Sequence, residues 1–214
     1  MRIDLGQVTL STGQKHLFGI SSGIGLDAIV CKKVQESFQK KILNKLHLGN
    51  IAYVLMTVQT LFSMKKYKVN ITIHEDSRHG NQHIEQPLCD SAGISFSDLI
   101  FLAGMNFPSE GGGVPMAPDA KADDGLLSIC AMNGISKLRS FFMLPFLMKG
   151  RHVNHRGVNI LNAHSITLTS EIPMTLHTDG EYVGDVTTLK MEILPAMLGI
   201  LKSPTALSPD IPLS

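Results

Sequence analysis

Hydrophobic and polar residues alternate along several stretches of the chain, which is the pattern of a β-strand with one buried face. The clearest stretch is 67–74, where tyrosine, valine and isoleucine alternate with lysine, asparagine, threonine and histidine. Similar alternation, or an apolar run of strand length, occurs at 3–8, 17–20, 96–103, 126–132, 166–168, 174–176 and 189–193. Many short strands separated by turn residues favour an antiparallel sandwich or barrel.

Helical periodicity is found in fewer places. At 51–62 the apolar residues recur with the spacing of one helix face, which predicts an amphipathic helix. Weaker helices are expected over 27–45 and 136–148, and Pro145 should end or kink the second because proline has no backbone N–H. We therefore expect a mainly β fold, an antiparallel β-sandwich with a few peripheral helices, forming one domain over residues 1–214.

The composition is that of a soluble globular protein, with 43% hydrophobic and 17% charged residues. A net charge of +1 gives no reason to expect nucleic acid or another polyanion as a partner. The charge is nevertheless uneven: residues 27–68 hold eight lysines and two acidic residues, whereas residues 75–124 hold nine acidic and two basic residues. This asymmetry indicates two faces with different partners, or simply solvated surface.

The cysteines and the apolar segments indicate a cytoplasmic protein. Cys31, Cys89 and Cys130 lack the spacing of a metal site, which fits reduced thiols. The first ten residues lack the apolar core of a signal peptide, and the longest apolar stretches, 51–62 and 141–148, are too short to span a bilayer. The stretch 141–148 could touch a membrane surface, although its composition favours core packing.

Two glycine-rich segments are candidates for ligand contact. In the segment 21–28 (SSGIGLDA), Gly23 and Gly25 follow a strand and open a helix, so that backbone amides there could attract phosphate; a tight strand-to-helix turn is the alternative. The segment 110–118 (EGGGVPMAP) has three consecutive glycines, which permit unusual dihedrals or close approach of a ligand. These glycines are Gly111, Gly112 and Gly113. Neither segment is a complete dinucleotide or P-loop motif.

Two Asp-Gly dipeptides predict turns and also offer carboxylates. In the segment 121–126 (KADDGL), Asp124 and a backbone carbonyl could instead hold a hard cation such as Mg²⁺. In the segment 178–181 (TDGE), Asp179 and Glu181 are two residues apart and would converge on one site in an extended chain. A hairpin turn between flanking strands is the alternative.

His177 would share a strand face with Asp179, as the lining of a cleft or as a solvated strand residue.

The order of these motifs resembles the diacylglycerol kinases and related lipid kinases. The segment 18–28 (FGISSGIGLDA) resembles the family's N-x-A-S-x-G-F-D-A element, and the EGGG, KADDGL and DGE segments follow in the family's order. The family's nucleotide-binding Gly-Gly-Asp-Gly-Thr motif is absent from this chain. The resemblance therefore implies the β-sandwich, substrate-side domain of such a kinase, with the N-terminal nucleotide-binding α/β domain absent from this chain.

By that resemblance, the enzyme transfers the γ-phosphate of ATP to a lipid hydroxyl such as that of diacylglycerol. Asp179 matches the general base and Glu181 its supporting carboxylate. Asp124 and the carbonyl of Leu126 match a structural Mg²⁺ site, with Lys121 as an outer partner because an ammonium group cannot ligate a cation. ATP is expected to bind mainly to the N-terminal domain, while Gly23, Gly25 and the glycines of 110–118 are candidate cofactor contacts.

The expected partners are a lipid substrate at the inner membrane surface, approached from the cytoplasm, and the chain's own N-terminal domain; a homodimer is left open. The lysines of 32–68 would favour an anionic membrane. Three alternatives stay open: a non-catalytic lipid-binding module, a domain like that of the NAD kinases, and an interaction β-sandwich in which every Asp-Gly is only a turn.

Overall fold

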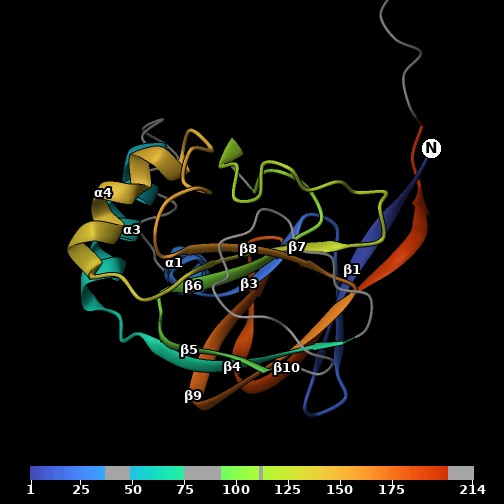
Figure 1. Ribbon diagram of the computed structural model, residues 1–214, viewed down its shortest axis with the longest axis horizontal. Helices are drawn as coiled ribbons and strands as arrows, with labels where there is room; N and C mark the ends of the chain where they lie inside the picture. The colour runs from blue at the N-terminus through green and yellow to red at the C-terminus, as the bar shows by residue number, and fades with distance from the viewer. Residues whose placement is uncertain (37–48, 75–92, 111–112, 202–214) are drawn as a thin grey trace, which may run out of the picture.

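The structure, a computed structural model, describes residues 1–36, 49–74, 93–110 and 113–201. Within these ranges, ten strands form one bent antiparallel sheet (Figure 1). The strands are β1 (Arg2–Leu10), β2 (Lys15–Phe18), β3 (Ser21–Gly25), β4 (Tyr67–His74), β5 (Gly93–Leu99), β6 (Phe101–Met105), β7 (Leu127–Met132), β8 (Val158–Ala163), β9 (Ser165–Thr178) and β10 (Glu181–Gly199). The mainly β, antiparallel fold expected from the alternation is confirmed.

The order of strands in the sheet is β2-β1-β10-β9-β3-β6-β7-β8, while β4 pairs with both β9 and β5. The long strand β9 connects the two parts: its first half pairs with β4 and its last residues pair with β3. Its register with β10 breaks between Thr169 and Met174. Such irregularities bend a strand, which lets β9 and β10 pass from one layer of the fold to the other.

Three described helices lie together on one side of the sheet (Figure 1). They are α1 (Leu26–Glu36), α3 (Gly49–Ser63) and α4 (Lys137–Leu147). α1 contacts β3, β9, β10 and α3, and α3 contacts α4. All three fall where helices are predicted, although residues 37–45 of the first prediction lie outside the described residues. Helix α4 continues past Pro145 to Leu147, because Met148 N still donates to Leu144 O at 2.9 Å.

Three details differ from the sequence prediction. The apolar run 96–103 is two strands, because the chain changes partner at Ile100: its N–H donates to Met132 O at 2.8 Å and its carbonyl accepts from Leu26 N at 2.9 Å. The segment expected to be a turn before α1 is strand β3, and β8 has no counterpart among the predicted strands. Both form strands by pairing with neighbouring strands, which in β3 overrides the weak strand propensity of serine and glycine.

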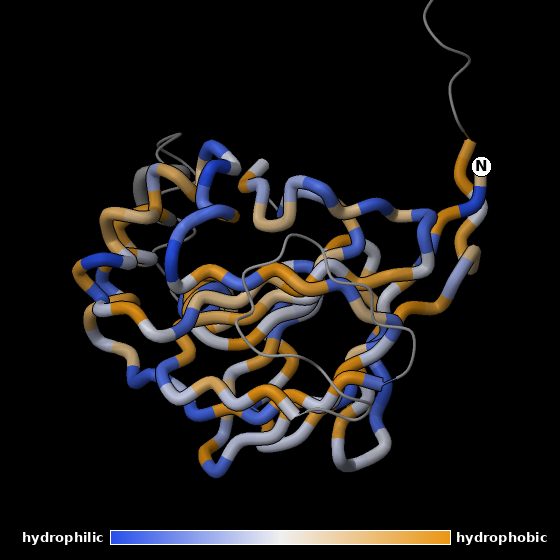
Figure 2. The backbone as a smooth tube through the Cα atoms, in the orientation of Figure 1, coloured by the Kyte–Doolittle hydropathy of each residue, from blue (hydrophilic) through white to orange (hydrophobic). Residues whose placement is uncertain are grey.

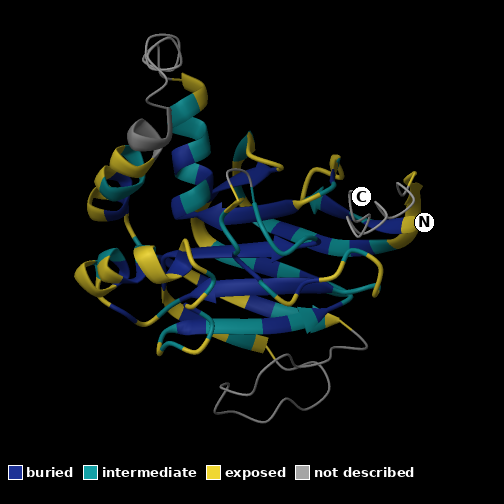
Figure 3. Ribbon diagram, turned by 90° about the horizontal axis from the view of Figure 1, so that it is seen from above, coloured by how far each residue is buried: buried dark blue, intermediate teal, exposed yellow. Residues whose placement is uncertain are grey.

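The core runs between the sheet and the helices. Figure 3 shows the central strands mostly buried, whereas exposed residues gather on the helices and connections. Of the predicted free thiols, Cys130 is buried and Cys31 half-buried, and both are unpaired. Cys89 lies outside the described residues.

Candidate functional site

Asp179 and Gly180 form the two-residue turn of the β9–β10 hairpin. Thr178 pairs with Glu181 across the turn, and both turn residues have positive φ, 47° for Asp179 and 82° for Gly180. Two positive φ angles are typical of a type I′ turn, for which Asp-Gly is a preferred dipeptide. The predicted hairpin is therefore confirmed. Asp179 is exposed at its tip.

The carboxylate of Asp179 binds the backbone that leads into β3. Its Oδ2 accepts from Gly19 N at 2.7 Å, and its Oδ1 accepts from Ile20 N at 2.8 Å and Ser21 N at 3.0 Å. The Asp179 N–H in turn donates to Ser21 O at 2.8 Å. A carboxylate offers about four acceptor positions, so about one remains for a further hydrogen-bond donor. The turn and the first glycine element thus form one site.

Glu181 does not share a partner with Asp179. It accepts a hydrogen bond from Gln35 Nε2, and Gln35 Oε1 accepts from Tyr182 N at 3.0 Å. The described contacts therefore direct Glu181 towards the end of α1, while Asp179 faces the Gly19–Ser21 backbone. The two carboxylates expected to converge are engaged with different segments, because Asp179 lies in a turn and not in extended backbone.

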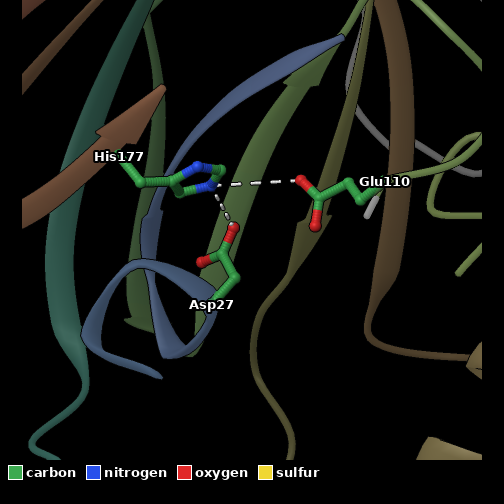
Figure 4. A group of neighbouring side chains, drawn as sticks. All are labelled: Asp27, Glu110 and His177. Atoms are coloured by element: carbon green, nitrogen blue, oxygen red, sulfur yellow. Dashed lines mark hydrogen bonds and ion pairs between the residues drawn. The ribbon is translucent and has the colours of Figure 1, made fainter. Parts of the chain in front are cut away.

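Beneath the turn lies a cluster of Asp27, Glu110 and His177, drawn in Figure 4. His177 Nε2 is 2.9 Å from Asp27 Oδ2 and 3.9 Å from Glu110 Oε1. His177 is 1% exposed, so the expectation of a solvated strand histidine is wrong. It is buried because β9 at this point is covered by α1 and paired with β3.

Burial controls the protonation of this cluster. The pKa of Glu110 is raised, first by burial and then by the Asp27 charge. Burial alone would lower the pKa of His177, but the charge of Asp27 and its hydrogen bond outweigh this and raise it. In the neutral ring, Nδ1 accepts from Gly180 N at 3.3 Å while Nε2 donates to Asp27. Protonation of Nδ1 would break the contact with Gly180, so the cluster is coupled to the turn.

Gly23 and Gly25 are explained by close packing. A Cβ atom at Gly23 would lie 2.6 Å from Asp27 Oδ2 and 2.9 Å from the carbonyl of Leu102. Gly25 has φ of 98°, and a Cβ atom there would lie 2.3 Å from the carbonyl of Ile100. Both glycines are buried in β3. This packing requires glycine at both positions without a phosphate, so their cofactor role stays a prediction.

The second glycine element is described only in part. Gly111 and Gly112 lie outside the described residues. Gly113 has φ of 78° with open space where a Cβ would be. Glu110 begins this loop: its N–H donates to Val114 O at 2.9 Å, and its carbonyl accepts from Gly113 N at 3.0 Å.

The KADDGL segment forms a turn fixed to β1. Asp124 is exposed, and its Oδ1 accepts from Leu126 N at 3.0 Å, the local turn contact of an aspartate. Asp4, which is 3% exposed, accepts from Gly125 N at 2.8 Å and from Ala196 N at 2.7 Å. Lys121 is exposed. The second carboxylate oxygen of Asp124 and the Leu126 carbonyl are the oxygen type of donor that Mg²⁺ prefers.

Asn106 links this turn to Asp179. It is fully buried, and its Nδ2 donates to the carbonyls of Asp4 and Gly19, each at 2.9 Å. Hydrogen bonds therefore run from Gly125 through Asp4, Asn106 and Gly19 to Asp179. Sequence reasoning missed Asp4 and Asn106 because each occupies a position that the pattern assigns to an ordinary strand or connection. It also missed Asp27 and Glu110, although both lie within the glycine motifs.

An apolar cavity of about 130 Å³ lies between the helices and the sheet. Asp27 and Glu110 contribute its two carboxylates. The rest of its lining is Leu26, Val30, Val54, Thr57, Leu61, Phe101, Val114, Met116, Met132, Ser140, Leu144, Leu147 and Met148. The buried acids are thus one end of a mainly hydrophobic pocket.

Among the described residues, Asp27, Glu110 and His177 form the only group of three or more His, Cys, Asp and Glu side chains whose donor atoms all lie within 4.8 Å. A metal at His177 Nε2 would require Nδ1 to carry the proton, and a protonated Nδ1 would face the Gly180 N–H. The observed hydrogen bonds therefore favour a protonated Nε2 and no metal ligation by this histidine.

Comparison with known proteins gives consistent results. The family model described as "YegS C-terminal NAD kinase beta sandwich-like domain" matches residues 20–202. The chain is 26% identical over 178 residues to YtlR of Bacillus subtilis (strain 168), named as a candidate lipid kinase, covering 83% of this chain and 52% of that protein. It is 24% identical over 183 residues to a diacylglycerol kinase of Staphylococcus saprophyticus, covering 86% and 51%.

A solved structure from Bacillus anthracis str. Sterne, named as a candidate diacylglycerol kinase, has the same fold. Its TM-score is 0.59 at 22% identity, with 92% of this chain and 55% of that chain covered. The chain thus spans about half the length of the relatives that it matches.

Proposed function

Because the chain belongs to the family of YegS C-terminal NAD kinase β-sandwich-like domains, we propose that it is the substrate-side half of a lipid kinase. The whole enzyme transfers the γ-phosphate of ATP to a lipid hydroxyl such as that of diacylglycerol, the activity named for several relatives. The chain spans about half of those relatives, and a nucleotide-binding α/β domain N-terminal to it would supply most of the ATP contacts.

One observation carries this proposal: the Asp179 turn and the first glycine element, two motifs of the resemblance about 160 residues apart, share one hydrogen-bonded site. A lipid hydroxyl is a weak nucleophile, and a positioned carboxylate that accepts its proton assists attack on the phosphate. The three amides hold the Asp179 carboxylate in place for this role. Glu181 acts at a distance, by holding Gln35 beside the start of β10.

The residues of the KADDGL turn fit a structural Mg²⁺ site, with Asp124 and the Leu126 carbonyl as ligands and Lys121 outside them. Bound there, Mg²⁺ would stabilise the folded domain, because an ion that binds only the native state shifts the folding equilibrium towards it. The line of hydrogen bonds through Asp4 and Asn106 would keep this turn in register with Asp179.

We place the enzyme at the cytoplasmic membrane surface, as a peripheral protein. No helix among the described residues is long and apolar enough to cross a bilayer. Apolar side chains that are 43–65% exposed cover α3 and α4, and we call them the α3–α4 apolar surface. They are Val54, Leu55, Phe62, Leu138, Phe142, Phe146 and Met148. Figure 2 shows how hydrophobic residues run along α4.

Basic residues border this surface. Lys65, Arg139, Lys149 and Arg151 are exposed there, and residues 136–170 contain no acidic residue. The combination of apolar and basic residues suits an anionic lipid surface. Three lysines of 32–68 are engaged within the domain, since Lys32, Lys66 and Lys68 pair with Asp185, Asp98 and Glu171. Lys40, Lys41 and Lys45 lie outside the described residues.

The proposed activity is tested with the full-length protein, by ATP-dependent phosphate transfer to diacylglycerol in mixed anionic vesicles. Asp179→Asn should lower turnover by about 10²–10⁴. Asp98→Asn, which removes an exposed carboxylate on β5, is the matched control and should leave turnover unchanged. No transfer by the wild-type protein to any lipid alcohol, or wild-type turnover by Asp179→Asn, would contradict the proposal.

A further inference from the structure

We propose that His177 is a positioning residue for phosphate transfer, because its neutral ring accepts the Gly180 N–H and thereby fixes the turn that presents Asp179. This inference rests on the proposed function for the role of Asp179 as the base. It adds the residues that hold the turn in its active conformation, which are His177 and, behind it, Asp27.

His177 controls the peptide between Asp179 and Gly180. This is the central peptide of the turn, and its N–H donates to His177 Nδ1 at 3.3 Å. A type I′ turn becomes a type II′ turn when the central peptide rotates by roughly half a turn. That rotation changes ψ of Asp179 and moves its carboxylate relative to the three amides that bind it. Asp179 has φ of 47°, which a residue other than glycine adopts only where its surroundings require it.

Asp27 determines which ring nitrogen of His177 carries the proton (Figure 4). Its Oδ2 lies 2.9 Å from Nε2, and a carboxylate accepts, so Nε2 is the donor and Nδ1 keeps its lone pair for Gly180. Gly23 leaves space for this pair, since a Cβ atom there would lie 2.6 Å from Asp27 Oδ2 and 2.9 Å from Nε2. The first glycine element and the Asp179 turn are thus joined a second time, through the imidazole.

Three carboxylates act on the protonation of His177. Burial alone lowers the pKa of His177, but the charges of Asp27 on α1, Glu110 in the loop after β6 and Asp179 in the turn outweigh it, together with the Asp27 hydrogen bond, and raise this pKa above its ordinary 6.5. A second proton can enter only at Nδ1, where it would face the Gly180 N–H. Protonation therefore removes the contact that fixes the turn and leaves the bond to Asp27 in place.

The other elements beside His177 carry groups that are engaged elsewhere or stay neutral. β3, which pairs with this end of β9, has no titratable side chain. Tyr182 of β10 lies opposite His177, and its hydroxyl accepts from Lys32 Nζ at 3.0 Å. Lys32 also pairs with Asp185 at 2.8 Å. On α1, burial raises the pKa of the Cys31 thiol to about 12. The protonation of His177 therefore depends chiefly on the three carboxylates.

Two amide substitutions separate the two contacts of His177. Asparagine has an oxygen at the δ position and can accept from Gly180 N, but its side chain is too short to replace Nε2 at Asp27. Glutamine has a nitrogen at the ε position and can donate to Asp27, but its δ position is a carbon atom that accepts nothing.

Phosphate transfer by the full-length protein distinguishes these variants. His177→Gln should lower kcat by about 10–100-fold with little change in KM for ATP, because a small misplacement of a reacting group has effects of this size. His177→Asn should keep kcat close to that of the wild type. His74→Gln, at an exposed histidine on β4, is the matched control and should also behave as the wild type does. Equal kcat values for His177→Gln and His177→Asn would overturn the proposal, since loss of packing alone affects both.

The pH dependence of kcat gives a second test. Wild-type kcat should fall as the pH drops through the raised pKa of His177, whereas His177→Asn does not titrate and should show no such fall. Unfolding does not explain the loss, because the raised pKa values of Glu110 and His177 favour the folded state at lower pH. Parallel pH profiles for the wild type and His177→Asn would overturn the proposal.

Nuclear magnetic resonance of the 214-residue chain tests the contact without any phosphate transfer. The Gly180 amide resonance should move as the His177 ring titrates, and His177→Asn should abolish this movement. A Gly180 resonance that does not follow His177 would overturn the inference even in an active kinase. If Gly180 follows His177 but the wild type transfers no phosphate, the proposed function fails and the positioning of the turn stands. If His177→Gln does not fold, as judged by circular dichroism, His177→Asn and the Gly180 resonance still decide the matter.

Discussion

Some residues of this site also hold parts of the fold together, which affects how variants at these positions are interpreted. Asp179 was predicted as a base, but its carboxylate also joins the β9–β10 turn to the start of β3 through three amides. Loss of activity in an Asp179 variant therefore has two explanations, lost chemistry and a displaced turn. Measuring the stability of the same variant separates them.

Asp179→Asn should lower the free energy of unfolding by about 1–2 kcal/mol. An amide presents one acceptor oxygen where the carboxylate presents two, and hydrogen bonds to a charged group contribute more than neutral ones. Urea unfolding monitored by circular dichroism measures the change. Asp98→Asn should change the same quantity by less than about 0.5 kcal/mol; similar losses in the two variants would mean that the three amides contribute little.

Gly23→Ala should destabilise the domain by about 1–3 kcal/mol. The new Cβ would press on the Asp27 carboxylate and on the Leu102 carbonyl, and the backbone oxygen cannot easily yield. Gly184→Ala on β10 is the matched control, because no atom lies within 4 Å of the position of its Cβ. Thermal melting of both variants checks the prediction, which fails if they melt together.

The Asp27–Glu110–His177 cluster makes stability depend on pH. The folded pKa values of Glu110 and His177 are raised above their ordinary 4.5 and 6.5, so the folded protein binds more protons than the unfolded chain. Such groups stabilise most below the unfolded pKa, and the contribution is lost as the pH rises through the folded pKa. The free energy of unfolding should therefore fall as the pH rises above about 4.5 towards neutrality.

Glu110→Gln should flatten this dependence, because glutamine does not titrate. Urea unfolding at several values between about pH 5 and 8 compares the variant with the wild type. That range avoids Asp185 and Glu192, whose lowered pKa values act with the opposite sign at lower pH. Parallel curves for the two proteins would show that Glu110 is ionised throughout.

At the scale of elements, helices α3 and α4 carry the exposed apolar residues and sit over the cavity. Part of the segment 141–148 does pack into the core, as its composition allowed, since Met143 and Leu147 are buried. The other face of the same helix is exposed. The two interpretations of this segment, core and membrane contact, therefore describe opposite faces of one helix.

Replacing Phe142 and Phe146 together by serine should reduce binding to anionic vesicles by about 10-fold or more, because each buried aromatic side chain contributes about 1.5–3 kcal/mol. Sedimentation with vesicles rich in phosphatidylglycerol measures the effect. Leu17→Ser, at an exposed leucine on β2, is the control and should bind as the wild type does. Equal loss in both variants would place the contact elsewhere.

The sequence predicted the strands and helices better than it predicted the long-range hydrogen bonds that join them at the site. Alternation located most strands because one face of each is buried, and the Asp-Gly dipeptide located the hairpin turn. Strand β3 was missed because serine and glycine carry little strand preference and its pairing is with distant segments. Asp4 and Asn106 were missed for a related reason: their partners are backbone groups from other parts of the chain, which no local pattern encodes.

At the scale of the whole molecule, the chain has one core shared by the sheet and the helices. Three of its motifs, the KADDGL turn, the first glycine element and the Asp179 turn, are joined by one line of hydrogen bonds. Nothing in that line resembles a nucleotide-binding loop, which agrees with the proposal that another domain provides one.

The 214-residue chain alone should therefore fold without kinase activity and without appreciable affinity for ATP. Calorimetric titration with Mg-ATP should give no binding in the micromolar range, whereas the full-length protein should bind. Circular dichroism of the same sample would serve as the control for folding. Micromolar ATP binding by the chain would contradict the proposed division of roles.

The pairing of β1 with β10 has a consequence for the time course of folding. Arg2 lies opposite Gly199, so this ladder cannot form completely until residue 199 has been synthesised. Proteins dominated by such distant pairings fold slowly, in milliseconds to seconds. During synthesis on the ribosome, the edge of β1 that pairs with β10 stays unpaired until β10 emerges. An unpaired strand edge can form hydrogen bonds with other chains and so promotes aggregation. We therefore expect a chaperone that binds the nascent chain to bind the unpaired edge of β1.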